Sequence, residues 1–191
     1  MITVIDIGCY AHSGGDASIP YLLDEFDPDL LFGFDPLTTD REWTLPGRRA
    51  RIVERAAAMW THDGTVPFER AATSSSAFPD DDRLERVSCV DVVRVVRELL
   101  EKNGGGLVVK MDAEGGEYVL LPALLEAGLV PRIALLWVEW HCPTCRRGSG
   151  DGRGHRDNCE AMRDGLDVPE RVVELRDAVI EAGCEVHPWN R

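Results

Sequence analysis

The sequence predicts an α/β fold: a doubly wound, mostly parallel sheet with helices on both faces. Short, continuously apolar runs alternate along the chain with longer segments of helical periodicity. Continuous apolar runs are typical of parallel strands that helices cover on both sides. The length of 191 residues and the 44% of hydrophobic residues suit one domain with a sizeable core. We therefore predict a single domain over residues 1–191.

The first half of the chain is predicted to hold three core strands and one helix. Residues 2–8 (ITVIDIG) form an apolar run that ends at a glycine. Residues 18–26 (SIPYLLDEF) combine an N-cap serine, an early proline and helically spaced apolar side chains, which predict a helix. A second strand is predicted at residues 30–36, where a proline stops it, and a third within residues 49–60. A short strand is predicted to follow at residues 66–70.

The second half begins with a predicted polar loop at residues 74–83 and then resumes the alternation. Residues 89–106 have a helical period and a glycine-rich stop, and residues 107–112 (LVVKMD) read as a fourth strand. A helix with a glycine C-cap is predicted at residues 117–128. The solidly hydrophobic residues 132–141 predict a fifth strand.

A polar segment of about 25 residues follows the fifth strand, far longer than the usual connection of ~4–6 residues. We interpret residues 142–168 as an insertion rich in cysteine, histidine and arginine. A final helix at residues 169–183 and a short strand at 184–189 complete the prediction. Because this C-terminal part is short, the last strands of the sheet are expected to be reduced or supplied by a partner.

Composition narrows the classes of partner. The chain has 34 acidic and 21 basic residues and a formal charge of −13, which argues against binding nucleic acid or anionic lipid with the surface at large. No run approaches the ~20 apolar residues of a membrane span. The N-terminal residues lack a secretory signal pattern, so we expect a cytoplasmic protein with reduced thiols. Cys9, Cys89 and Cys184 sit singly in apolar surroundings and are expected to be buried.

The ends of the first two predicted strands indicate a nucleoside site. A glycine-bearing loop follows Asp6, and such a loop lets the backbone approach a ligand at a helix N-terminus. Asp35 follows Gly8 by about 27 residues, where an acid can accept both ribose hydroxyls. The structural alternatives are a loop that only turns the chain and a plain Asp-Pro turn. The Gly-x-Gly spacing of a pyrophosphate site is missing, which weighs against a dinucleotide oxidoreductase, and Asp6 suits a cationic ligand such as S-adenosylmethionine.

Several segments, in order, resemble FkbM-type methyltransferases: VIDIG, FGFDP, AAAMWTHDGTVPFE, the SSS run, VKMDAEGGEYVLL and VEWH. The resemblance covers residues 2–141. It implies a class I, Rossmann-like methyltransferase fold that uses S-adenosylmethionine, in a family many of whose members methylate hydroxyl oxygens of sugars or natural products. It also implies that Asp35 binds the ribose and that Asp112 and Glu114 lie near the transferring methyl group or shape that pocket. The cofactor contacts predicted in this way are Asp6, Gly8, Tyr10, Asp35, Pro36 and Glu114.

The predicted catalytic residues are Asp112, Glu139 and His141. Asp112 ends the fourth strand, where an acid could orient an acceptor hydroxyl, take its proton, hold a divalent cation or bind the amino group of the cofactor. Glu139 and His141 lie two residues apart at the end of the fifth strand, on one face, and could join Asp112 in a metal or acid/base cluster. The alternative for His141 is a hydrogen bond to a loop carbonyl. Glu114 is expected in the first helical turn, where the helix dipole stabilises an acid, and Glu117 is expected to pair locally.

The insertion holds a second candidate metal site. Two close pairs of soft ligands fit a tetrahedral structural zinc, and the alternative is a loop with incidental thiols. The arginines of the same segment could attract an anionic acceptor, or they could be solvated. The zinc candidates are Cys142, Cys145, His155 and Cys159.

Together these features predict an S-adenosylmethionine-dependent methyltransferase that transfers the methyl group in line to a hydroxyl of a sugar or small natural-product-like acceptor. The expected partner is this small molecule, with neither nucleic acid nor membrane, in a chain compatible with a homo-oligomer. The alternative is a non-catalytic nucleoside-binding or zinc-organised interaction protein on the same fold.

Overall fold

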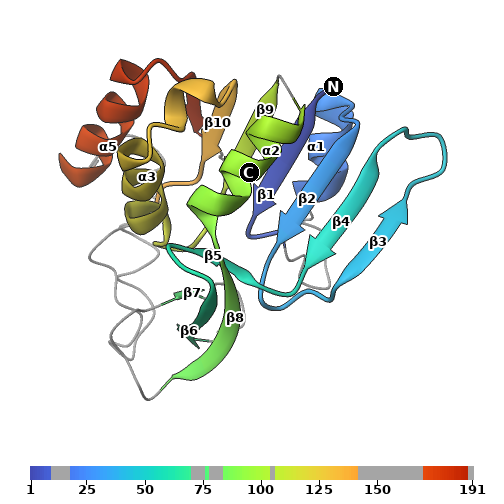
Figure 1. The fold of residues 1–191 in the computed structure, drawn as a ribbon, viewed down its shortest axis with the longest axis horizontal. Helices are drawn as coiled ribbons and strands as arrows, with labels where there is room; N and C mark the ends of the chain where they lie inside the picture. The colour runs from blue at the N-terminus through green and yellow to red at the C-terminus, as the bar shows by residue number, and fades with distance from the viewer. Residues whose placement is uncertain (10–17, 70–75, 78–83, 104–105, 142–169, 189–191) are drawn as a thin grey trace, which may run out of the picture.

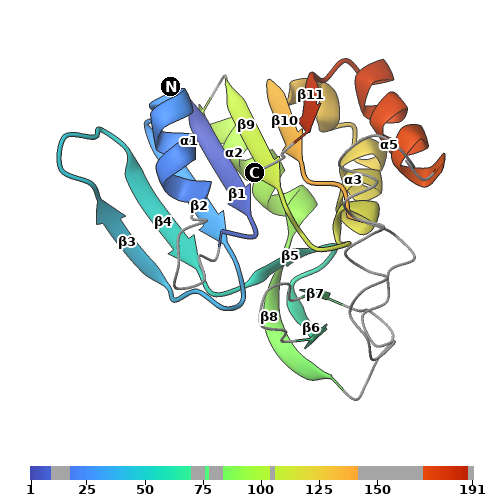
Figure 2. The same cartoon turned by 180° about the vertical axis from the view of Figure 1, so that it is seen from behind.

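The computed structural model describes residues 1–9, 18–69, 76–77, 84–103, 106–141 and 170–188. Within these residues the protein is an α/β structure with one large and one small sheet (Figures 1 and 2). Tyr10, Cys142, Cys145, His155 and Cys159 lie outside the described residues, as does the predicted insertion at 142–168.

The large sheet has seven strands in the described part of the chain, in the order β11-β10-β9-β1-β2-β4-β3. All neighbouring strands pair in parallel except β3, which runs antiparallel to β4. Counted along the chain, the six parallel strands lie in the order 3-2-1-4-5-6, which is the order of doubly wound sheets. The predicted α/β class with a mostly parallel sheet is confirmed. The strands are β1 (Thr3–Ile7), β2 (Leu30–Phe34), β3 (Arg41–Thr44), β4 (Arg51–Arg55), β9 (Leu107–Met111), β10 (Leu135–Val138) and β11 (Val186–Pro188).

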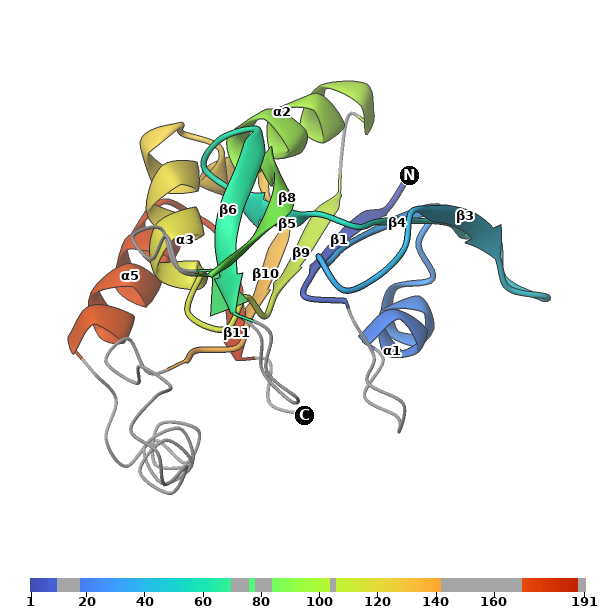
Figure 3. The same cartoon turned by 90° about the horizontal axis from the view of Figure 1, so that it is seen from below.

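Helices cover both faces of this sheet. Neighbouring side chains along each strand point to opposite faces, and both sets are apolar, so each face packs against helices. Val4 of β1 belongs to one apolar cluster with Ile19 and Leu22 of α1 (Ser18–Phe26). Ile5, the next residue of β1, belongs to the opposite cluster with α2 (Val92–Asn103) and α3 (Glu117–Glu126). Figure 3 shows α1 and α2 on opposite sides of the sheet. Helix α5 (Glu170–Glu181) packs beside α3.

The small sheet lies beyond the ends of the central strands of the large one. Its order is β5-β8-β6-β7, and in Figures 1 and 2 it lies below the arrowheads of β1, β2 and β4. Its apolar cluster, which includes Trp60 and Phe68, packs against Leu37 after β2 and Val119 of α3. The small sheet is thereby fixed next to the carboxyl ends of the large sheet. Its strands are β5 (Ala58–Trp60), β6 (Gly64–Glu69), β7 (Ser76–Ala77) and β8 (Glu85–Asp91).

Several predicted elements differ from the structure. The single strand predicted within residues 49–60 is two strands, β4 and β5, which belong to different sheets. A turn separates them, held by hydrogen bonds from Ala56 N to the Asp40 carboxylate (2.8 Å) and from Ala57 N to Arg55 O (2.9 Å). The predicted strand at 132–141 is shortened to β10, because the 3-10 helix η1 (Val130–Arg132) precedes it. The sequence also did not predict β3, β7 within the predicted loop at residues 74–83, or β8 as a strand before α2.

Other predictions agree closely. Helix α1 has the predicted bounds, and Cys9, Cys89 and Cys184 are buried free thiols. In the part of the chain that the structure describes, no helix combines the length and apolarity needed to cross a membrane.

Candidate functional site

The central pair of strands, β1 and β9, marks the point where the chain order of the sheet reverses. Doubly wound sheets bind ligands just beyond the carboxyl ends of the strands at this point. Gly8 and Asp112 follow β1 and β9 there, and Asp112 N donates a 3.0 Å hydrogen bond to Ile7 O. Gly8 has a φ of +80°, and a Cβ built on it would lie 2.0 Å from the carbonyl oxygen of Asp112. Glycine is therefore required at this position by both conformation and space.

Asp6, predicted to contact the cofactor, lies in the interior. Its side chain is fully buried, accepts a hydrogen bond from Ser18 Oγ at the start of α1 and forms an ion pair with Lys110. The carboxylate of Asp6 thus fixes the beginning of α1 to the end of β1. In the described residues the Asp6 carboxylate contacts Ser18 and Lys110. Asp6 therefore supports the residues of the site from the interior of the protein.

Lys110 connects the two central strands, and the sequence analysis did not single it out. Its side chain is 1% exposed, and Nζ lies 2.9 Å from Gly8 O, 3.1 Å from Asp6 Oδ1 and 3.3 Å from Asp112 Oδ2. Burial alone would lower the pKa of Lys110, but the Asp6 and Asp112 carboxylates outweigh it and raise the pKa. Lys110 is therefore a charged lysine that joins Asp112 to the end of β1. The one available signal was a lysine inside a continuously apolar strand.

Asp35 and Pro36, the other predicted cofactor residues, follow β2 and are half-buried. Leu37 N donates a 2.7 Å hydrogen bond to Asp35 Oδ1, and Thr38 N donates to Asp35 O at 3.2 Å. The Asp-Pro turn considered as the structural alternative is thus present. It also places the Asp35 carboxylate at the carboxyl end of the strand next to β1, where the nucleoside hypothesis requires it.

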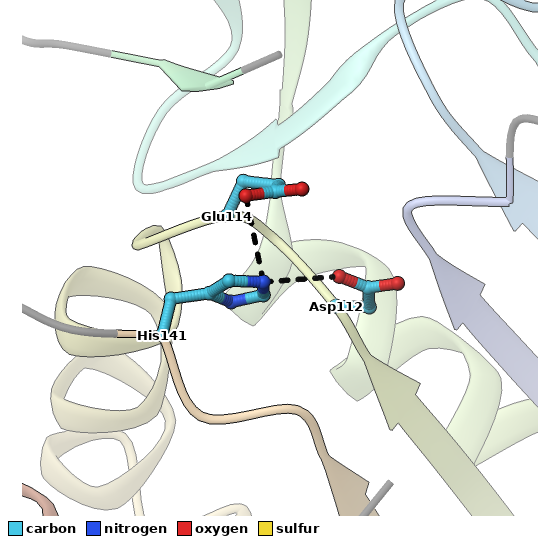
Figure 4. A group of neighbouring side chains, drawn as sticks. All are labelled: Asp112, Glu114 and His141. Carbon is cyan, nitrogen blue, oxygen red and sulfur yellow. Dashed lines mark ion pairs between the residues drawn. The ribbon is translucent and has the colours of Figure 1, made fainter. Parts of the chain in front are cut away.

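The predicted catalytic residues come together at the ends of β9 and β10. Glu139 N donates a 2.9 Å hydrogen bond to Met111 O, which continues the strand pairing and keeps Glu139 beside Asp112. His141 Nε2 lies 3.5 Å from Glu114 Oε2, 3.7 Å from Asp112 Oδ1 and 3.8 Å from Glu139 Oε1. Figure 4 shows Asp112, Glu114 and His141 pointing toward one another from separate segments. One ligand atom from each of these three residues lies within 4.8 Å of the other two, a spacing that could hold a metal ion.

Glu117 orients His141. The side chain of Glu117 is fully buried, and its Oε1 accepts hydrogen bonds from the backbone N of His141 at 2.7 Å and from ring Nδ1 at 3.0 Å. Its Oε2 accepts a 2.9 Å hydrogen bond from Gly115 N. The partner of Nδ1 is thus a carboxylate, whereas the alternative considered for His141 was a loop carbonyl. From the sequence, Glu117 was expected only to pair locally, and its role in orienting His141 was not predicted.

Glu114 lies in the turn before α3, and the expectation that it lies in the first helical turn was wrong. It has a φ of +49°, in the left-handed region that residues with a Cβ rarely adopt, and Gly115 follows with a φ of +101°. The chain adopts this turn because Gly116 N bonds to Ala113 O (3.0 Å) and the Glu117 carboxylate holds Gly115 N. The turn directs the Glu114 carboxylate toward the imidazole (Figure 4).

Like charges and burial shift the pKa values in this cluster. Burial alone would lower the pKa of His141, but the carboxylates of Glu117, Glu114 and Asp112 outweigh it and raise the pKa to about 10. Burial and the neighbouring Asp112 charge raise the pKa of Glu139 to about 7. The cluster therefore concentrates more negative charge than its two protein cations, Lys110 and His141, can neutralise, and it suits a proton or a cation.

The structure thus brings Asp112, Glu114, Glu139 and His141 into one cluster, links Gly8 and Asp6 to it through Lys110, and places Asp35 two strands away. No protein-family model, curated protein or solved structure matches this chain.

Proposed function

We propose that the protein is an S-adenosylmethionine-dependent methyltransferase of the FkbM type, with a class I fold, that methylates a hydroxyl oxygen of a sugar or small natural-product-like acceptor. The observation that carries the proposal is the pair of acidic positions on either side of the switch point. Asp35 follows β2, and the cluster of Asp112, Glu139 and His141 follows β9 and β10. This separation suits a nucleoside on one side and an acceptor on the other.

The side chains at the carboxyl ends of the strands, called the rim below, fit a cationic cofactor. Asp112, Glu114 and Glu139 present carboxylates at the ends of β9 and β10, and the first loop lacks the Gly-x-Gly spacing that a pyrophosphate requires. When bound, S-adenosylmethionine supplies an electrophilic methyl group on a positively charged sulfur. Carboxylates near this sulfur would stabilise the positive charge, whereas they would repel the phosphates of a dinucleotide.

The protein's part in the reaction is to align and deprotonate the acceptor. The acceptor oxygen forms a bond to the methyl carbon while the bond from carbon to sulfur breaks, and the hydroxyl proton must leave. Asp112 and Glu139, which both lie within 4 Å of His141 Nε2, would accept a hydrogen bond from the hydroxyl, and one of them would then take its proton. His141 is held by Glu117 and positions these carboxylates.

Calorimetry tests the cofactor half of the proposal. S-adenosylmethionine and S-adenosylhomocysteine should bind the purified chain, and Asp35→Ala should weaken binding at least about tenfold by removing the ribose hydrogen bonds. Asp35→Asn is the matched variant, because it retains an oxygen acceptor for Leu37 N and so the turn. NAD should not bind. The proposal would be contradicted if both Asp35 variants kept full affinity, or if the chain bound neither S-adenosylmethionine nor S-adenosylhomocysteine.

The acceptor half has a separate test. Release of S-adenosylhomocysteine should depend on an added polyhydroxyl acceptor, and Asp112→Asn should lower turnover while it leaves the affinity for S-adenosylhomocysteine, which lacks the positive charge on sulfur, within about threefold. Turnover retained in Asp112→Asn would remove this carboxylate from the reaction.

A further inference from the structure

We infer that Asp112, Glu114 and His141 bind a divalent metal ion at the carboxyl ends of β9 and β10, with Glu139 beside it. The three residues come from three separate segments: the end of β9, the left-handed turn before α3 and the end of β10. Their ligand atoms nevertheless converge within 4.8 Å of one another (Figure 4).

The orientation of His141 supports a metal site. Its side chain is 13% exposed, and its Nδ1 is 3.0 Å from the fully buried carboxylate of Glu117. This contact leaves Nε2 directed at the carboxylates of Asp112 and Glu114. Histidines that bind metals commonly donate the other ring nitrogen to a carboxylate in this way, which fixes the tautomer and the ring. Glu117 accordingly has the position of a residue that supports a metal ligand.

The spacing of the carboxylates around Nε2 also suits a metal ion. The distances from Nε2 to Glu114 Oε2 and Asp112 Oδ1 are 3.5 and 3.7 Å, longer than the Nδ1 contact and longer than a good hydrogen bond. Ligands about 2.1 Å from a metal ion lie ~3.4 Å apart at tetrahedral angles. The two distances from Nε2 are within a few tenths of an ångström of this value, and the remaining pair of ligand atoms lies within 4.8 Å.

The charge of the cluster also favours a metal ion. Asp112, Glu114, Glu117 and Glu139 surround one imidazole, which can carry only one positive charge, and Lys110 is already shared between Asp112 and Asp6. Carboxylates this close repel one another unless a cation lies between them. A divalent ion supplies the missing positive charge at the point where the ligand atoms meet.

The ligand set selects the class of ion. An imidazole nitrogen with two or three carboxylates suits Mn²⁺ or Zn²⁺, whereas Ca²⁺ prefers six to eight oxygen ligands. With three protein ligands, positions stay open for an outside oxygen. The role of the ion in catalysis rests on the proposed function: it would bind the acceptor hydroxyl and make its proton easier to remove. It would also let an anionic acceptor approach a rim that otherwise carries three carboxylates.

Manganese binding tests the site directly. The purified full chain, freed of metal ions with a chelator that is then removed, should bind one Mn²⁺ in a titration monitored by electron paramagnetic resonance. His141→Ala and Glu114→Gln should each weaken binding at least about tenfold, and Glu117→Gln about tenfold through the orientation of the ring. Glu114→Gln keeps the volume of the side chain, so its result stands even if His141→Ala fails to fold.

Two controls separate this site from other ligands. His187→Ala removes an exposed histidine that is paired with Glu185 (2.6 Å), and the double variant Cys142→Ser/Cys145→Ser removes the soft ligands of the zinc candidate. Both should leave Mn²⁺ affinity unchanged. Absence of binding up to about 1 mM Mn²⁺, or equal affinity in Glu114→Gln, would overturn the metal site. Calorimetry with S-adenosylhomocysteine in the presence of chelator is independent of the ion, so it separates failure of this inference from failure of the proposed function.

Discussion

A single oxygen of Glu117 holds both the backbone and the ring of His141, at 2.7 Å from the peptide nitrogen and 3.0 Å from Nδ1. The segment that follows β10 is thereby attached to the first turn of α3, and the imidazole has one orientation. Because Glu117 is fully buried, water cannot replace these bonds if the carboxylate is lost.

Glu117→Ala should therefore destabilise the fold by about 3–5 kcal/mol, since it leaves a partly buried imidazole and two peptide N–H groups without their acceptor. Unfolding in denaturant at neutral pH measures the loss. Glu126→Ala is the matched control at the exposed end of the same helix and should change stability by less than about 0.5 kcal/mol. Equal effects of the two substitutions would contradict the assignment.

Lys110→Met should cost about 3–5 kcal/mol, because it leaves the buried Asp6 carboxylate without its cation. Adding Asp6→Asn to Lys110→Met should recover part of the loss, since the uncompensated charge is removed. Denaturant unfolding of the two single variants and the double variant gives the coupling energy. Lys102→Met, at an exposed lysine on α2, should be nearly neutral, and strict additivity of Asp6→Asn and Lys110→Met would show that the pair is uncoupled.

Gly8→Ala combines two penalties that a second glycine separates. Gly128 also has a positive φ, +65°, but a Cβ there would meet nothing within 4 Å, so Gly128→Ala should cost only about 1 kcal/mol of conformational strain. At Gly8 the added methyl also collides with the carbonyl of Asp112, and the loss should be at least about twice as large. Thermal unfolding of both variants compares them. Similar losses would mean that the strand ends can move apart at no cost.

The interaction of Glu54 predicts a pH dependence of stability away from the cluster. Burial alone would raise the pKa of Glu54, but hydrogen bonds from Arg41, Trp43 Nε1 (2.6 Å) and Thr38 Oγ1 (3.0 Å) outweigh it and lower the pKa from 4.5. A carboxyl group with a lower pKa in the folded state stabilises the fold above its unfolded pKa, and this contribution is lost as the pH falls through the folded pKa.

The measurement compares wild type with Glu54→Gln, which cannot ionise but keeps an acceptor oxygen. The difference in unfolding free energy should be constant from about pH 7 to about pH 5 and should shrink as the pH falls below about 4.5. A difference that stays the same down to about pH 3 would show that ionisation of Glu54 does not contribute.

Much of the large sheet could be predicted from the sequence because its strands are buried on both faces. All five residues of β1 and of β9 are buried, and such runs are continuous in the sequence. Helix α1 was predicted with its bounds because Ser18 and Pro20 mark its first turn. Strand β8 was missed because its exposed residues alternate with buried Val87 and Cys89 next to a stronger helical pattern.

The candidate site was predicted in part. Asp112, Glu139 and His141 could be grouped because parallel strands present their carboxyl ends at one edge. The role of Glu117 depends on the fold of the turn at Gly115, which the local sequence does not determine. Lys110 was missed because a lysine in an apolar strand gains its meaning only from Asp6, which is distant in the sequence and adjacent in the sheet.

The small sheet begins with β5 and ends with β8, and these two strands pair in parallel, with Ala58 opposite Cys89 and Trp60 opposite Asp91. The chain consequently leaves the large sheet and returns to it through two adjacent strands. Replacing the segment between β5 and β8 with a different loop or hairpin would change the structure next to the carboxyl ends of the large sheet. The hydrogen bonds between the strands of the large sheet would stay in place. Under the proposed function, the preference for one acceptor would then depend on a segment that can be exchanged without changing Asp35 and the strand that carries it.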